Sequence, residues 1–473
     1  MSESCAAKGC SSNCTVNLFD RLRSMDLELA KVVRQPASSS QNSEQAIVGD
    51  YDDLVLQLNQ PLPLVAELAW REIDQDYVWI AVQEAALVAL DSASHSVMLA
   101  FQTGASPHEL LNDGAEWPLL SGLIGRLASA GFIRGIIGYR DNKPPKAERF
   151  ARLHLTRACQ LECTHCYADS SPRVDRSNEI TTERWSQFLN EFADIGGEQV
   201  LFTGGEALMH DGCPQLMREA KDLGLHVTLF SNGMLVPKFV DDIKRYADLV
   251  QISLDGPTPD LNDVIRGRNT FQHILKALDV LAEAGVNTRI GMTAVPKDWN
   301  IWVREFEKIR NRYINYPNIT YKLSYGIMAY GRGGALDATE VADRTSVKTF
   351  LNEVNGFPGP SITRYQSGCG YAEQIVVGPD GIIYPCHLLD SPVCHIDERP
   401  IAEIAKILWG VGEAFGVDHV EGCKSCEIRY LCGGSCRVLA GRASGSRKMN
   451  LCSPEAKLQK YKNMAQTYHN QYG

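Results

Sequence analysis

The residues Cys159-Gln160-Leu161-Glu162-Cys163-Thr164-His165-Cys166 place three cysteines within eight positions, directly after the predicted strand Ala151–Thr156. Three thiolates on one tight loop can bind three irons of a 4Fe–4S cluster and leave the fourth iron open to a substrate or cofactor. A zinc site would need a fourth protein ligand, which His165 or His154 could supply. The spacing favours the cluster over zinc, and three free thiols are the remaining alternative.

The composition indicates the cellular compartment in which such a cysteine loop would function. The 473-residue chain has 15 cysteines, 44% hydrophobic residues and a net charge of −10. No apolar run approaches the ~18 residues of a membrane span, and the first residues lack a signal peptide's apolar stretch. We therefore predict a cytoplasmic protein with no membrane partner, in which metal sites are favoured over disulfides. The negative charge argues against nucleic acid as a partner.

Strands and helices alternate after Phe150. This rhythm predicts an α/β fold with a parallel sheet or partial barrel, whose chemistry lies at the C-terminal ends of the strands. The predicted strands are Ala151–Thr156, Gln199–Thr203, His226–Phe230, Leu249–Leu254, Thr288–Ala294 and Tyr321–Gly326.

Polar residues and glycines follow three of these strands. The segments are Thr203-Gly204-Gly205-Glu206, Ser231-Asn232-Gly233 and Ser253-Leu254-Asp255-Gly256. Glycines there would let the backbone approach a ligand closely, and Glu206 and Asp255 could accept hydrogen bonds from an ammonium group and a ribose. Arg266 could pair with a carboxylate. Each signal alone is weak, but their joint occurrence after the cysteine loop is informative.

Residues 150–335 thus resemble the radical S-adenosylmethionine (radical SAM) enzymes. The resemblance implies a partial (β/α)6 barrel, a 4Fe–4S cluster and S-adenosylmethionine, which is cleaved to a 5′-deoxyadenosyl radical. It also implies that Cys159, Cys163 and Cys166 are the cluster ligands. The implied cofactor contacts are His165, Gly204, Gly205, Glu206, Ser231, Asn232, Ser253, Asp255 and Arg266. The family's adenine motif on the fifth strand has no clear match.

The C-terminal segment 361–473 is rich in cysteine and short of long periodic elements. Its pattern is Cys369-x11-Gly381-x4-Cys386, then Cys423-x2-Cys426-x5-Cys432-x3-Cys436, then x15-Cys452. Structural zinc sites would also suit Cys-x2-Cys pairs. After a radical SAM domain, however, the pattern resembles the SPASM extension, an iron–sulfur domain. The resemblance implies two auxiliary clusters, and so three 4Fe–4S clusters in all. The implied distal ligands are Cys423, Cys426, Cys432 and Cys452, and the implied proximal ligands are Cys369, Cys386 and Cys436.

A small module is predicted at residues 46–140. We expect strands at Tyr77–Val82, Ala86–Leu90 and Val97–Phe101, a helix starting at the capping box Ser106–Glu109, and a helix from Pro118 to Ala130. This winged-helix-like order resembles the peptide-binding chaperone of pyrroloquinoline quinone biosynthesis (PqqD-like). A DNA-binding winged helix is the alternative, but acidic residues outnumber basic ones here. An edge strand could instead add a leader peptide to its sheet.

Residues 1–45 form a further segment, with Cys5, Cys10 and Cys14 before a Ser/Gln-rich linker. Three ligands are too few for a closed metal site, so free thiols at a frayed terminus are as plausible as a cluster contact. The predicted domains are therefore 1–45, 46–140, 149–335 and 361–473.

The domain layout resembles that of sactipeptide synthases and of the maturase of quinohemoprotein amine dehydrogenase. It implies a maturase that modifies a ribosomally made peptide or protein subunit, with a reductase or flavodoxin-type electron donor. In some relatives a further cysteine shortly upstream completes the proximal cluster, but here only Cys213 lies between Asp169 and Gly368. Unless Cys394, a carboxylate or an N-terminal thiol completes it, the proximal cluster would keep an open iron for a substrate thiolate, and we expect a thioether cross-link. The alternatives are a carbon–carbon cross-link or other side-chain oxidation, a small-molecule radical enzyme of cofactor biosynthesis, and an iron–sulfur electron carrier.

Overall fold

The computed structural model describes residues 59–133, 149–294, 299–325, 330–335 and 365–472. The chain forms two compact units, Met1–Asn142 with Ile362–Arg364, and Lys143–Ser361 with Tyr365–Gly473. The predicted segment 1–45, with its three cysteines, lies outside the described residues, as do both ends of the predicted 46–140 module. Within the described ranges, no helix has the length and apolar character needed to cross a membrane.

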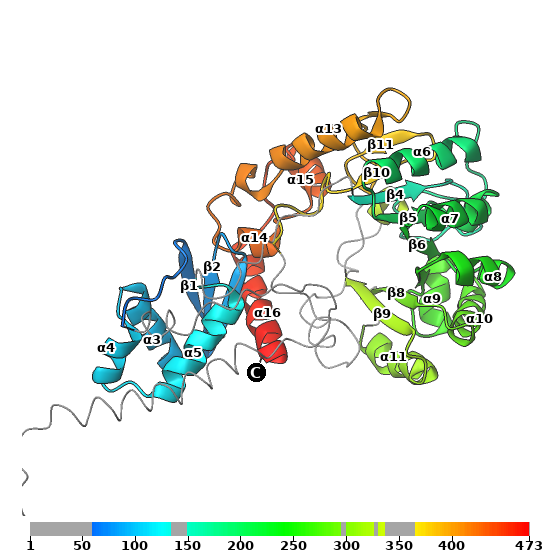
Figure 1. The fold of residues 1–473 in the computed structure, drawn as a ribbon. Coiled ribbons are helices and arrows are strands. Elements are labelled where there is room, and N and C mark those ends of the chain that lie inside the picture. Colours follow the sequence, from blue (N-terminus) through cyan, green and yellow to red (C-terminus); the bar gives the residue numbers. More distant parts are fainter. Residues whose placement is uncertain (1–58, 134–148, 295–298, 326–329, 336–364, 473) are drawn as a thin grey trace, which may run out of the picture. The chain divides into compact units, whose positions relative to one another are not determined.

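The first unit has three antiparallel strands followed by three helices (Figure 1). The strands are β1 (Leu68–Ile73), β2 (Asp76–Ala81) and β3 (Ala86–Leu90), in that order, and the helices are α3 (Ser92–Gln102), α4 (Pro107–Asn112) and α5 (Trp117–Ala130). The capping box is confirmed, because the Glu109 N–H donates to Ser106 Oγ and the Ser106 N–H donates to the Glu109 carboxylate. Helix α5 ends at Gly131, whose φ of 86° suits glycine.

The predicted strand Val97–Phe101 is wrong, since these residues lie within α3. Asp91 caps this helix by accepting a hydrogen bond from the Ser94 N–H at 2.7 Å. The apolar run then buries Val97, Met98 and Phe101 at helical spacing. The strand that completes the sheet is β1, which the sequence analysis missed. It lies at the sheet edge with residues 70–72 exposed, so it lacks the alternation of apolar and polar residues that predicts a strand.

The second unit contains six parallel strands in sequence order, as predicted. They are β4 (Phe150–His154), β5 (Gln199–Thr203), β6 (His226–Ser231), β7 (Leu249–Ser253), β8 (Thr288–Ala294) and β9 (Ile319–Tyr325). The connecting helices are α6 (Thr182–Asp194), α7 (Cys213–Asp222), α8 (Val236–Tyr246), α9 (Pro259–Arg266), α10 (Thr270–Glu283) and α11 (Trp299–Tyr313).

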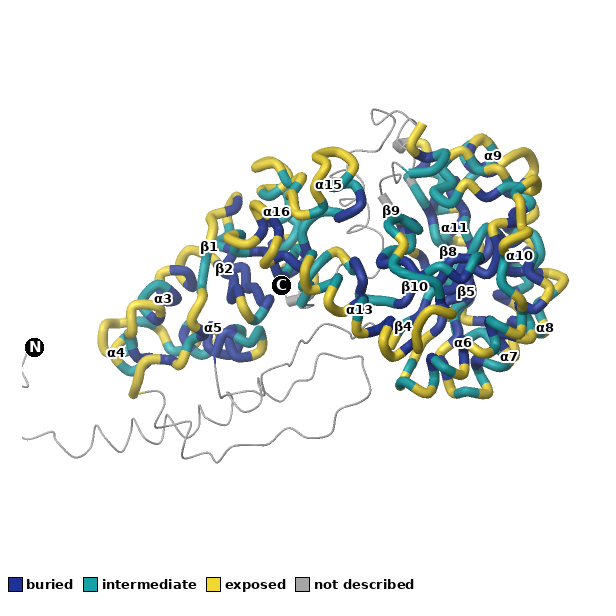
Figure 2. Tube along the Cα trace, turned by 90° about the horizontal axis from the view of Figure 1, so that it is seen from above, coloured by how far each residue is buried: buried dark blue, intermediate teal, exposed yellow. Residues whose placement is uncertain are grey.

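The two faces of this sheet differ. On one face, alternate strand residues such as Val227, Leu229, Val250 and Ile252 are fully buried in a core that they share with the helices. The dark blue strands between partly yellow helices show this layering (Figure 2). The residues between them, such as Gln251, point to the other face and are only half-buried. Alternation with a period of two is the reason that the six strands were predictable.

The Cys-rich C-terminal region continues the same sheet. Strand β10 (Ile375–Val377) pairs in parallel with β4, and β11 (Ile382–Tyr384) and β12 (Cys394–His395) follow in antiparallel pairing. The helices are α13 (Ile401–Ala414), α14 (Arg429–Cys432), α15 (Arg437–Ser444) and α16 (Pro454–Tyr472). The expectation of few long elements is wrong, because α13 has 14 residues and α16 has 19.

Candidate active site

The cysteine loop leaves the C-terminal end of β4 and is held by backbone hydrogen bonds. The Cys159 N–H donates to the Ser171 carbonyl at 3.3 Å, and the Cys166 N–H donates to the Cys163 carbonyl at 3.2 Å. Cys159 is buried, whereas Cys163 and Cys166 are partly accessible. Burial raises the pKa of Cys159 to about 11. The loop therefore presents three thiols in one place, as predicted from their spacing.

Arg332, which the sequence analysis missed, clamps this loop. Its N–H donates to the Cys166 carbonyl at 3.0 Å, its Nε to the Cys163 carbonyl at 2.9 Å and its Nη2 to the Ser170 carbonyl at 2.8 Å. The preceding Gly331 has a φ of 55°, and a Cβ there would lie 2.5 Å from the Cys166 carbonyl oxygen. The only signal in the sequence was the glycine-rich run 331–334 shortly after the last predicted strand.

Gly204 and Gly205 pack against the segment that leads into the cysteine loop. The Gly205 N–H donates to the Thr156 carbonyl at 2.8 Å, and the Glu206 N–H donates to the Ala158 carbonyl at 2.9 Å. A Cβ on Gly204 would lie 2.4 Å from the Thr156 oxygen, and one on Gly205 would lie 2.3 Å from the Ala158 oxygen. Both positions thus require glycine because two backbone segments approach each other, independently of any ligand.

Glu206 is a buried carboxylate next to the first cysteine of the loop. Its oxygens accept hydrogen bonds from the Leu208 N–H at 3.2 Å and from the Asn232 N–H at 2.8 Å. Asn232 in turn places its Nδ2 3.5 Å from Cys159 Sγ. Burial raises the pKa of Glu206 to about 7. In the described part of the chain no Lys, Arg or His forms an ion pair with it, so this charge has no cationic partner there.

Asp255, by contrast, is paired twice. His165 Nε2 lies 2.8 Å and Arg266 Nε 2.6 Å from its Oδ2, and the Thr293 N–H donates to its Oδ1 at 3.1 Å. Burial alone would raise the pKa of Asp255, but the neighbouring Arg266 and His165 side chains lower it well below its usual range. Three predicted site residues thus meet, although both Asp255 oxygens already have donors.

The remaining predicted contacts lie at adjacent strand ends. Ser231 Oγ accepts a hydrogen bond from the Gly233 N–H at 3.0 Å and is buried beside Glu206. Ser253 is the last residue of β7, two positions before Asp255. The C-terminal ends of β4 to β7 therefore bring together the thiols of the cysteine loop, the Glu206 carboxylate and the ion pair of Asp255.

Comparison with known proteins agrees with this arrangement. The model of the radical SAM superfamily matches residues 153–306. An AdoMet-dependent heme synthase of Oleidesulfovibrio alaskensis is 30% identical over 342 residues, which cover 65% of this chain and 86% of that protein. A PqqA peptide cyclase of Bradyrhizobium diazoefficiens is 28% identical, covering 62% of this chain and 82% of that protein. The chain belongs to the radical SAM superfamily of enzymes.

A solved radical SAM structure also shares the fold. The crystal structure of Streptococcus suis SuiB bound to S-adenosylmethionine superposes with a TM-score of 0.51 at 16% identity, covering 82% of this chain and 99% of that one. The match extends beyond the residues covered by the superfamily model, so the fold similarity includes more than the radical SAM domain.

Three cations that were not predicted occupy the sheet face opposite the helices. They are Arg152 on β4, Arg289 on β8 and Lys322 on β9. Burial lowers the pKa of Lys322, and the charges of Arg289 and Arg152 lower it further. Within the described residues none of the three has an acidic partner at ion-pair distance. This face of the sheet is therefore electropositive and would attract a carboxylate or another anion.

The seven C-terminal cysteines form two groups. Burial raises the pKa of Cys386 to about 11, and the neighbouring Cys369 and Cys436 thiols contribute to that rise. Burial likewise raises the pKa of Cys423, and there the contributing thiols are Cys432 and Cys426. Cys452 is brought toward the second group because the Leu451 N–H donates to Ser435 Oγ at 3.2 Å. Cys369, Cys386 and Cys436 are thus neighbours, as are Cys423, Cys426 and Cys432, and the assignment of these thiols and Cys452 to two clusters stays a prediction.

Two other cysteines are further from these groups. Cys213 is fully buried in α7 within the apolar core, as expected for a lone thiol. Cys394 lies on β12 with Glu398 and Arg399 as its charged neighbours. Among the described residues, no three His, Cys, Asp or Glu side chains converge on one point as a single metal ion would require. In a 4Fe–4S cluster each thiolate binds a different iron, so its ligands need no common point.

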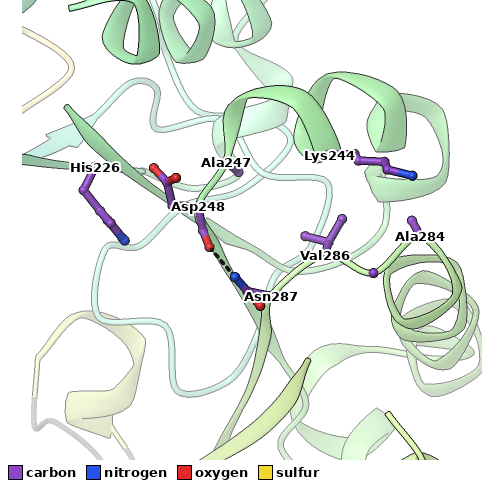
Figure 3. A pocket seen from close by; sticks show the side chains of 8 residues that line it. His226, Lys244, Ala247, Asp248, Ala284, Val286 and Asn287 are labelled. Atoms are coloured by element: carbon purple, nitrogen blue, oxygen red, sulfur yellow. Dashed lines mark hydrogen bonds between the residues drawn. The ribbon is translucent and has the colours of Figure 1, made fainter. Parts of the chain in front are cut away.

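The hollow shown in Figure 3 is not this site. Its volume is about 440 Å³, and its lining residues include His226, Asp248 and Asn287, at the start of β6 and just before β7 and β8. It therefore lies at the N-terminal ends of the strands, opposite the cysteine loop. The Asn287 Nδ2 donates to the Asp248 carbonyl at 3.4 Å, and no candidate cofactor contact lines the hollow.

Proposed function

We propose that this protein is a radical SAM maturase that modifies a ribosomally made peptide or protein subunit by forming a thioether between a cysteine sulfur and a carbon. The observation that carries the radical SAM part is Glu206, a buried carboxylate without a cationic partner in the described chain, one side chain away from Cys159. A buried charge is costly unless it is paired. The ammonium group of S-adenosylmethionine would supply the missing charge.

The donor set fits both cofactors of the reaction. Cys159, Cys163 and Cys166 would hold a 4Fe–4S cluster, which when bound supplies the electron that cleaves S-adenosylmethionine into methionine and a hydrogen-abstracting 5′-deoxyadenosyl radical. Glu206 would bind the methionyl ammonium, and Arg266 the methionyl carboxylate. Because Arg266 and His165 already contact Asp255, the ribose contact proposed for Asp255 would require at least one of these donors to move.

Two auxiliary clusters are supported by the C-terminal cysteine groups. Cys369, Cys386 and Cys436 would hold the proximal cluster. The distal cluster would be held by Cys423, Cys426, Cys432 and Cys452. The residues fit an anionic group, because Arg437 is fully buried there and its Nη1 has no hydrogen-bond partner in the described chain. The three-cysteine proximal set leaves room for a substrate thiolate.

A peptide substrate is supported by the first unit and by similarity to the PqqA peptide cyclase. The edge strand β1 exposes residues 70–72, so an extended leader peptide could add to this sheet. We infer a PqqD-like role for this unit, a partial (β/α)6 barrel for β4–β9, and a flavodoxin-type or reductase electron donor. The product would have lost two hydrogens and one free thiol.

A small-molecule radical SAM enzyme is the second candidate. It is favoured by the similarity to heme synthases and by the cations Arg152, Arg289 and Lys322, which suit a substrate with carboxylates. An acidic peptide would suit them equally well, so the substrate class must be tested directly.

The deciding experiment is co-expression with short cysteine-containing open reading frames encoded beside the gene. Mass spectrometry should show a peptide that is lighter by two hydrogens and has one cysteine protected from alkylation. A Cys159→Ala enzyme should give unmodified peptide. A modified peptide that alkylates at every cysteine would replace the thioether by a carbon–carbon cross-link. Absence of any modified peptide, together with conversion of a porphyrin carboxylate by the purified enzyme, would favour the second candidate.

A further inference from the structure

Arg437 is a buried cation that forms no ion pair with a carboxylate in the described residues. It is the first residue of α15, directly after Cys436, and its side chain is fully buried. Its Nε donates to the Phe415 carbonyl at 3.0 Å, its Nη2 lies 3.5 Å from the Gly433 carbonyl, and its Nη1 has no partner. The described part of the chain offers no acidic side chain at ion-pair distance. Burying a guanidinium in this way is costly unless a negative charge lies nearby.

The groups that Arg437 faces belong to both auxiliary cysteine sets. A Cβ on Gly434 would lie 2.6 Å from Arg437 Nη2 and 3.3 Å from Cys423 Sγ, so the guanidinium and the distal thiol meet at the same glycine. On the other side, the Arg437 backbone N–H donates a hydrogen bond to Cys369, a thiol of the proximal set. Arg437 thus acts electrostatically on one thiol of each set.

A second cation reaches only the distal set. Lys460, on helix α16, donates from its Nζ to Cys432 Sγ. The neighbouring Lys457 also hydrogen-bonds a distal thiol, Cys426, but its Nζ lies 2.7 Å from Glu427, whose carboxylate accepts a hydrogen bond from the Tyr461 hydroxyl. The charge of Lys457 is therefore compensated within the protein. Lys460 has no acidic partner at ion-pair distance in the described chain.

We propose that Arg437 is a fixed counter-charge shared by both auxiliary clusters, and that Lys460 adds positive charge to the distal cluster alone. This inference rests on the auxiliary clusters of the proposed function. An iron–sulfur cluster held by thiolates is anionic and gains negative charge on reduction, so a nearby cation and an N–H donor to sulfur favour the reduced form. Arg437 therefore raises the reduction potentials of both clusters, and Lys460 raises only the distal one.

The test measures potentials and needs no substrate. Full-length protein carrying Cys159→Ala, Cys163→Ala and Cys166→Ala is reconstituted anaerobically, so that only the auxiliary clusters remain, and its iron and sulfide are counted. Redox titration followed by electron paramagnetic resonance then gives the midpoint potential of each cluster. Adding Cys386→Ala identifies the distal signal by removing the proximal one.

Lys460→Met should lower the distal midpoint potential and leave the proximal one unchanged. Arg437→Gln, which keeps a donor for the Phe415 carbonyl, should lower both. Lys406→Met removes the same charge from an exposed position on α13 and serves as the control, with no shift expected.

The outcomes separate the two proposals. If the parent protein binds no auxiliary iron, the proposed function fails, and this inference fails with it. If both clusters assemble but Lys460→Met leaves both potentials unchanged, or shifts both equally, the charge assignment is refuted while the clusters stand. If Arg437→Gln does not assemble its clusters, the potential of Lys460→Met still decides the role of Lys460. The role of Arg437 at the distal site is then decided by Arg437→Met in protein that also carries Cys386→Ala. A parent-like potential in that last variant would refute the shared counter-charge.

Discussion

The carboxylate of Glu206 offers the sharpest perturbation of cofactor binding. Glu206→Gln keeps the size of the side chain and one carbonyl oxygen, but removes the charge that would meet the methionyl ammonium. Losing a charge-assisted hydrogen bond at a buried site costs about 2–3 kcal/mol. We therefore expect S-adenosylmethionine to bind about 30- to 150-fold more weakly.

The same change should have little effect on the stability of the ligand-free protein. Two backbone donors, the Leu208 and Asn232 N–H groups, share the carboxylate, and the amide can accept from only one of them. An unsatisfied donor costs about 1–3 kcal/mol. Removing a buried, unpaired charge offsets that loss, since its burial is what raises the pKa of Glu206.

The assay is equilibrium dialysis of S-adenosylmethionine against the anaerobically reconstituted protein, with 5′-deoxyadenosine measured in parallel. Glu198→Gln is the matched control, because Glu198 precedes the opposite end of β5 and is half-exposed beside Arg149. The control should bind like the parent. The reasoning is refuted if Glu206→Gln binds the cofactor within about threefold of the parent while retaining its cluster. A large loss of thermal stability would show instead that Glu206 is a structural acceptor.

Four further predictions follow from other contacts. Gly205→Ala should destabilise the protein by ~1–3 kcal/mol in chemical denaturation, because its Cβ would meet the Ala158 carbonyl, whereas Gly122→Ala in the open part of α5 should not. Arg332→Met should lower the iron content of the first cluster without changing the auxiliary iron, since the Cys163 and Ser170 carbonyls lose their side-chain donors; equal iron would contradict the clamp. Arg289→Gln should reduce kcat/KM for a carboxylate-bearing substrate roughly tenfold while the affinity for S-adenosylmethionine stays constant, and a parent-like kcat/KM would remove the electropositive face from substrate binding. Burial lowers the pKa of His95 below its usual value, so the stability that neutral His95 contributes is present at pH 8 and is lost on acidification. After correction for the intrinsic exchange rate, the hydrogen-exchange protection factors of β2 should fall between pH 8 and pH 5, while those of α6 stay constant.

The six parallel strands were predictable to within two residues at each end. Strands β6 and β7 alternate between buried and less buried positions, and β5 is a short run of buried residues. Both patterns are local and need no knowledge of the tertiary structure. The error at Val97–Phe101 has a local cause as well, since an apolar run of five residues fits either element. Asp91 caps the N-terminus of this segment and so stabilises it as a helix. Strand β1 was missed because an edge strand with an exposed face has few apolar residues in an alternating pattern.

The site residues were predictable to the extent that they touch the proposed cofactors. The thiols, Glu206, Asp255 and Arg266 lie in short loops whose order along the chain follows the order of the strands. Residues that act on the site from a distance were not predictable. Arg332 comes from a segment more than 160 residues after the cysteines that it supports, as the separations of its hydrogen bonds show. No local pattern connects Arg152 on β4 with Lys322 on β9 either.

The buried charges of this protein divide into two kinds, and the division follows function. Asp255 is compensated within the chain by Arg266 and His165, so its pKa falls despite burial. Glu206 and Arg437 are buried without a partner of opposite charge in the described residues, one acid and one base. A folded chain tolerates such groups only if something outside it supplies the counter-charge. Each group also has hydrogen bonds within the fold, Glu206 to two backbone N–H groups and Arg437 to two carbonyls, but these bonds do not supply the opposite charge. We propose that an ammonium group supplies it for Glu206 and that anionic auxiliary clusters supply it for Arg437, as a radical SAM enzyme with such clusters would need.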